Sequence, residues 1–140
     1  MIVEGNLKIV GGGIYNDPDR SVSVTSIEPY INARRNNKIK KITIHHMAGV
    51  LSVETCGNIF ANPSRQASSN YAIGSDGRIA MYVEEKNRSW CSSSNANDQR
   101  AITIECASDT SEPYAFRDVV YNRLIDLCVD ICKRNGKNKL

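Results

Sequence analysis

The sequence predicts a single α/β domain, in detail α+β, in which helices pack on a central mixed β-sheet. Its 140 residues, 41% of them hydrophobic, suit one domain over 1–140 with a core of its own. Two segments, 41–46 and 101–106, alternate in the manner of strands, and a hairpin pattern lies between them. A long amphipathic segment near the end predicts a helix that covers one face of the sheet.

The beginning of the chain predicts the least, and we treat residues 1–36 as an N-terminal extension. Three consecutive glycines and an Asp-Pro-Asp step interrupt it, and Val22 and Val24 alternate with serines as in a short edge strand. Regular structure is expected from the strand 41–46 onward.

Turn and cap signals place the elements that follow. Ser52 is expected to cap a short helix that ends before Asn62-Pro63. Residues 70–73 and 78–83 are expected to pair as a hairpin, because Asp76-Gly77 is a strong turn signal between them.

The second half of the chain contains one loop, one strand and one long helix. A polar loop over 88–100 carries Trp90, the only tryptophan, and leads into the strand 101–106. The helix is expected from about Pro113 to Asn135, since proline suits a first helical turn and Gly136 suits the position after the end.

Composition excludes several classes of protein. The net charge of +3 is too small to indicate nucleic-acid binding, and no window is apolar enough to cross a membrane. The first residues lack the long apolar stretch of a secretory signal, so we expect synthesis in the cytoplasm. Five cysteines without a CxxC pair do not indicate a disulfide scaffold.

The two strand segments share a pattern that places titratable side chains on one face. Ile-Thr-Ile is followed by His45 in the first segment and by Glu105 in the second. Because side chains alternate, both leave the isoleucine face at the carboxyl end of their strand. If the strands are parallel neighbours, an imidazole and a carboxylate meet in one cleft, which would suit a metal ligand beside an acid/base group.

Structural roles remain open for each of these residues on the pattern alone. His45 and Glu105 could be solvated ends of strands, and Tyr71 could be a packing residue. His46 continues the isoleucine face, so we expect it to be buried or to support a ligand rather than to be one.

Four segments in order resemble the type-2 N-acetylmuramoyl-L-alanine amidases, a family that includes phage endolysins and shares its fold with peptidoglycan recognition proteins. The resemblance runs from about Ile39 to Gly136 and is carried by these segments: Thr43 to Gly49, Ala67 to Ile79, Arg88 to Trp90, and Ala101 to Glu105. It implies a peptidoglycan recognition protein-like amidase fold and a Zn²⁺-dependent hydrolase. The implied partner is bacterial peptidoglycan, cut between N-acetylmuramic acid and L-alanine during cell-wall lysis, after release from the producing cell.

The resemblance also implies roles for individual residues. His45 would bind zinc, Glu105 would act as acid/base on the attacking water, and Tyr71 would lie beside the metal and hold the substrate carbonyl. Asn70 and Trp90 are expected to contact substrate. Thr43 and His46 are expected to support the metal ligand from behind.

The implied zinc site is incomplete in this sequence. The family uses a further histidine and a cysteine after the long helix, and no such segment precedes Leu140. We therefore expect a shortened catalytic domain that binds zinc weakly and exposes apolar surface through which it could self-associate.

Two other functions follow from the same observation. The alternative is a non-catalytic peptidoglycan-binding or regulatory module of the same fold. A third interpretation is a cysteine peptidase that pairs Cys91 or Cys56 with His45.

Overall fold

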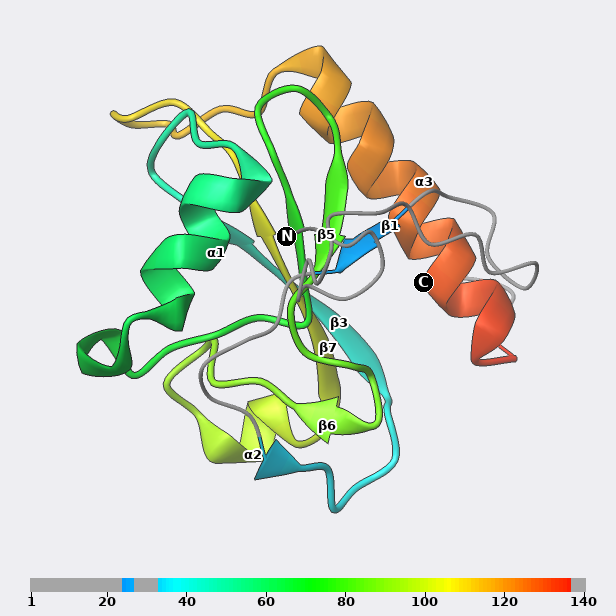
Figure 1. The fold of residues 1–140 in the computed structure, drawn as a ribbon. Coiled ribbons are helices and arrows are strands. Elements are labelled where there is room, and N and C mark those ends of the chain that lie inside the picture. Colours follow the sequence, from blue (N-terminus) through cyan, green and yellow to red (C-terminus); the bar gives the residue numbers. More distant parts are fainter. Residues whose placement is uncertain (1–23, 27–32, 137–140) are drawn as a thin grey trace.

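The predicted mixed sheet with helices packed on it is confirmed. The structure is a computed structural model that describes residues 24–26 and 33–136, so Val22 and most of the N-terminal extension lie outside the described residues. Five strands form the sheet in the order β1-β5-β4-β7-β3 (Figure 1). These are β1 (Val24–Ser26), β3 (Lys41–His46), β4 (Tyr71–Ile73), β5 (Ile79–Met81) and β7 (Ala101–Cys106). Two short strands, β2 (Ala33–Arg34) and β6 (Asn87–Arg88), form a separate antiparallel ribbon.

The central strands β3, β7 and β4 run parallel, and β4 turns back into β5 as the predicted hairpin. The turn between β4 and β5 requires a glycine at Gly77, whose φ is +87°. A Cβ at this position would lie 2.6 Å from Cγ2 of Val119, so the hairpin also packs tightly on the long helix.

The two main helices lie on opposite faces of the sheet, α1 (Val53–Ala61) on one and α3 (Asp118–Arg134) on the other (Figure 1). The predicted cap of α1 is confirmed, because Ser52 accepts a hydrogen bond from the Thr55 amide. Short helical turns follow at η1 (Pro63–Arg65) and α2 (Asn95–Asp98). Among the described residues, no helix has the length and apolar character needed to span a membrane.

The predicted start of the long helix at Pro113 is wrong. The helix begins at Asp118, because the preceding residues form a loop closed by hydrogen bonds from the Asp109 amide to the Ala115 carbonyl and from the Tyr114 amide to the Ser111 carbonyl. The predicted end is confirmed, since Gly136 follows the helix with a φ of +68°.

Each face of the sheet contributes to a separate hydrophobic cluster. On the α3 face, Ile102 and Ile104 of β7 pack with Leu127 and its neighbours. On the α1 face, the small residues Ala72 and Ala80 pack under Val53. β3 is the last strand of the described sheet, and its isoleucine face is only partly covered: Ile44 is 47% exposed.

Candidate active site

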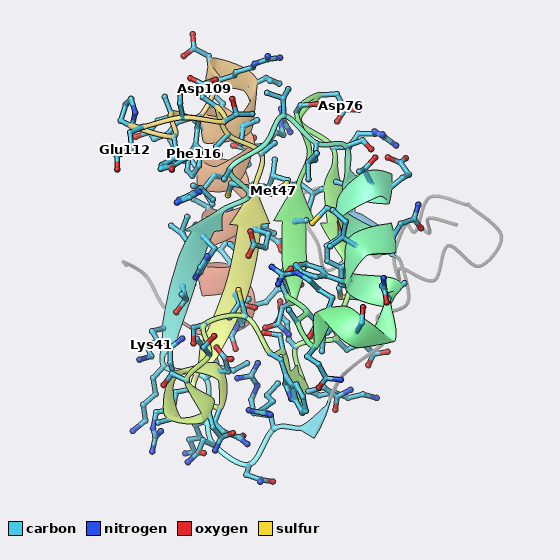
Figure 2. All side chains as sticks on the ribbon, turned by 90° about the vertical axis from the view of Figure 1, so that its left-hand side faces the viewer. Lys41, Met47, Asp76, Asp109, Glu112 and Phe116 are labelled. Atoms are coloured by element: carbon cyan, nitrogen blue, oxygen red, sulfur yellow. The ribbon has the colours of Figure 1, made fainter. Side chains whose placement is uncertain are left out.

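The predicted convergence of His45 and Glu105 is confirmed. β3 and β7 pair in parallel with these two residues opposite one another, and Nδ1 of His45 lies 3.7 Å from Oε1 of Glu105. The His45 side chain is 44% exposed, whereas that of Glu105 is 13% exposed. The pair lies near the carboxyl end of both strands, where Figure 2 shows Met47 just beyond β3. An open imidazole therefore stands beside a sheltered carboxylate.

The sheltered position of Glu105 makes it a suitable proton carrier near neutral pH. Burial raises the pKa of the Glu105 carboxyl to about 7, although a hydrogen bond from Cys91 and the positive charge of Arg65 act in the opposite direction. A carboxyl with a pKa near neutrality can accept a proton and return it within one reaction cycle.

Cys91 is a neighbour of the site, because its Sγ lies 3.7 Å from Oε1 of Glu105 and donates to it. Its loop is held by the buried carboxylate of Asp98, which accepts hydrogen bonds from the amides of Cys91 and Ser92. The sequence offered no signal for Asp98 beyond its position in a polar loop. Asp98 thus fixes the loop that presents the thiol to Glu105.

The geometry gives no support to a cysteine nucleophile. Burial and the neighbouring Glu105 charge raise the pKa of the Cys91 thiol well above its usual range. Burial likewise raises the pKa of Cys56 to about 12. Because a nucleophilic cysteine needs thiolate character, both thiols are in unsuitable surroundings.

Asn70 is expected from the resemblance to contact substrate, but the structure places it in the interior. Its side chain is fully buried and donates to the carbonyls of Val83, Glu84 and Asn87. Its Oδ1 accepts from the backbone amide of Thr103 in β7. Asn70 therefore ties the loop after β5 to the strand that carries Glu105, which is a supporting role.

Tyr71 lies on the face opposite Glu105, which differs from the expected place beside the metal. In the register of β4 and β7, Tyr71 is paired with Ile104, whereas Ala72 is paired with Glu105. The Tyr71 ring is fully buried in the α3 cluster, and its hydroxyl donates to Glu85 at 2.6 Å. Tyr71 is a core residue and is not brought to the site.

His46 also lies on the α3 face, but it is exposed rather than buried. Its ring stacks on Tyr114 with 4.4 Å between centroids, so it packs on the loop before α3 and not behind His45.

Thr43 shares the face of His45, and its hydroxyl accepts a hydrogen bond from the Asn97 amide at 3.1 Å. Trp90 precedes Cys91 in the loop, is half-buried, and lies under the guanidinium of Arg88 at 5.0 Å. Its Nε1 is buried without a hydrogen-bond partner among the described residues. A contact between Trp90 and substrate remains a prediction.

The donor set does not form the three-ligand zinc site that the resemblance implies. His45 is placed to bind a metal ion, with the carboxylate of Glu105 beside it. Within residues 24–26 and 33–136, however, no three His, Cys, Asp or Glu side chains are grouped so that they could hold a metal ion. The described chemistry of the site therefore rests on Glu105 and His45.

Solved structures of known proteins share this fold at low sequence identity. The catalytic domain of XlyA has a TM-score of 0.64 at 14% identity, over 84% of this chain and 80% of that one. A mutant endolysin from Bacillus subtilis has a TM-score of 0.62 at 14% identity, over 76% and 70% of the two chains. The Drosophila peptidoglycan recognition protein SA has a TM-score of 0.61 at 15% identity, over 79% and 69%.

The sequence itself identifies the family. None of the curated proteins matches this chain, and the chain spans 66% of the length of PlyL, another endolysin-like structure of the same fold with a TM-score of 0.61. The sequence model of one family, described as N-acetylmuramoyl-L-alanine amidase, matches residues 35–139, which include β3, β7 and both main helices. The chain belongs to the N-acetylmuramoyl-L-alanine amidase family.

Proposed function

We propose that this protein hydrolyses the amide between N-acetylmuramic acid and L-alanine in bacterial peptidoglycan, in the manner of an endolysin. The observation that carries the proposal is the His45–Glu105 pair, which membership in an amidase family places in a chemical context. Peptidoglycan as substrate also agrees with the fold shared with an endolysin and a peptidoglycan recognition protein.

Glu105 carries the proton in the proposed reaction. Its carboxylate accepts a proton from the water that attacks the lactyl carbonyl, and it then donates that proton to the L-alanine nitrogen as the C–N bond breaks. The products are a muramic acid carboxylate and a peptide with a free amino terminus. His45 borders the same space and is the residue that would bind the zinc ion implied by the family resemblance.

The test is the chemistry of the product. Purified peptidoglycan treated with the chain should release peptides with new N-terminal L-alanine, detected by amine labelling and mass spectrometry. Glu105→Gln should lower the rate by about 10²–10⁴-fold. Glu112→Gln is the matched control, because it is the same substitution in an exposed loop on the other side of the sheet (Figure 2).

A Glu105→Gln variant with the wild-type rate would assign proton transfer to another group. Wild-type cleavage at a different bond would overturn the proposed specificity.

A non-catalytic peptidoglycan-binding module is the second candidate. The observation that favours it is the donor set, in which His45 has no cluster of metal-binding side chains around it among the described residues. Such a module would sediment with insoluble peptidoglycan and release no new amino termini.

Where the protein acts and how it assembles are further parts of the proposal. We infer action on the cell wall after release from the producing cell. Self-association would use the exposed apolar side chains of β3 and α3, which include Ile44, Tyr121 and Ile125. Sedimentation velocity over a range of concentrations tests the second point.

A further inference from the structure

An open pocket lies against α1, the helix on the same face of the sheet as Glu105. Its volume is about 510 Å³. The lining is mainly hydroxyl and amide groups with one cation and one apolar side chain: Thr55, Asn58, Ile59, Asn62, Ser64 and Arg65. The first four follow the helical spacing i, i+3, i+4 and i+7, so one stripe of α1 and the turn η1 form the pocket together.

Arg65 gives this pocket its charge. Among the described residues, no carboxylate lies within ion-pair distance of Arg65, whereas Arg78 pairs with Glu54, and Arg134 pairs with Glu85. Arg65 is also close enough to the site for its charge to favour the ionised form of Glu105. A guanidinium without a protein carboxylate therefore lies within electrostatic reach of the candidate active site.

The chemistry of the proposed substrate indicates which part of it would meet this pocket. Amide formation consumes the lactyl carboxylate of muramic acid, so the glycan strand offers no anionic group near the bond that is cut. The stem peptide does offer one, at the α-carboxylate of its second residue. That residue is close in the chain to the bond that is cut, since an extended peptide advances only ~3.3–3.6 Å per residue.

We propose that the pocket beside α1 is a subsite for the stem peptide, in which Arg65 binds a free carboxylate of the second stem residue. The proposal rests on the proposed peptidoglycan function and adds a preference to it: stems with the free carboxylate bind better than stems in which that group is an amide. Arginine suits this role because its planar guanidinium can donate two parallel hydrogen bonds to one carboxylate.

Two ligands that differ in this one group test the preference. N-acetylmuramoyl-L-alanyl-D-isoglutamate carries the carboxylate, and N-acetylmuramoyl-L-alanyl-D-isoglutamine carries the amide. Calorimetry on the 140-residue chain, with a chelator present so that binding is measured without turnover, should give about fivefold tighter binding of the carboxylate ligand. The preference should shrink as salt is added.

Substitutions of Arg65 complete the test. Arg65→Gln should bind both ligands equally, and Arg65→Lys should keep part of the preference, because it retains the charge without the planar fork. Arg123→Gln removes the same charge from α3 on the opposite face and should keep the full preference. Circular dichroism verifies that each variant is folded; Arg65 is exposed, so its replacement leaves the core intact.

The outcomes separate the subsite from the function on which it rests. Equal binding of the two ligands by the wild type, or an unchanged preference in Arg65→Gln, overturns the subsite and leaves the proposed function standing. Failure of the wild type to bind either ligand, with no cleavage of peptidoglycan, overturns the proposed function and the subsite together.

Discussion

The two faces of the sheet differ sharply although the same strands build both. On the α3 face, β7 contributes Ile102 and Ile104 to a dry cluster with Leu127. On the α1 face, the same strand contributes Thr103 and Glu105, which contact polar groups. Because alternate residues of a strand point to opposite faces, one six-residue segment supplies both a core and a site.

This difference predicts that substitutions separate by face. Changes on the α3 face should lower stability with little direct effect on chemistry, and changes beside Glu105 should do the reverse. Such a separation is expected where a rigid sheet positions reactive groups that are not needed for its packing.

Leu127→Ala on the α3 face should give the largest change in stability. Leu127 is fully buried, so its truncation removes apolar contacts and leaves a cavity that costs about 3–5 kcal/mol in the free energy of unfolding. Ile125→Ala on the same helix is the matched control, because Ile125 is 46% exposed and should cost less than about 1 kcal/mol. Urea unfolding measures both, and similar losses would contradict the assignment of the core.

The pH dependence of stability should report the burial of Glu105 on the α1 face. Its pKa is about 7 in the folded protein and lower in the unfolded chain, so between these values the folded state binds more protons. Stability from this group is therefore present at low pH and lost as pH rises to about 7, by roughly 2–3 kcal/mol. Glu105→Gln should remove this loss.

The measurement compares urea unfolding of the wild type and Glu105→Gln at pH 5 and pH 8 with a chelator present. The difference between the two proteins isolates Glu105 from other titrating groups. Equal pH dependence in both would show that the Glu105 carboxyl is well solvated.

Local signals in the sequence were enough to predict the parts of the structure that local physics determines. Alternation in two segments placed His45 and Glu105 on one face, and the repeated Ile-Thr-Ile pattern anticipated their parallel pairing. Ser52 and Asp76-Gly77 specified a helix cap and a turn through the hydrogen bonds and backbone angles that these residues favour.

The remaining differences come from tertiary structure that local patterns do not encode. The short strand β4 does not reveal which of its residues face α3; that phase is set by the pairing of Tyr71 with Ile104 across strands. Asn70 resembles a surface polar residue until the loop after β5 closes over it. The segment from Pro113 has a suitable helix start, but the hydrogen bonds of a closed loop replace it.

Tyr71→Phe gives the smallest expected effect and the sharpest comparison of the two faces. The substitution keeps the buried ring and removes the hydroxyl that donates to Glu85, while the Arg134–Glu85 ion pair remains. Loss of one hydrogen bond to a charged partner should cost about 1–2 kcal/mol in the free energy of unfolding. Peptidoglycan hydrolysis should stay near the wild-type rate, because the hydroxyl lies on the face away from Glu105. Urea unfolding and release of new amino termini measure the two quantities, and loss of hydrolysis at unchanged stability would place Tyr71 in the site after all.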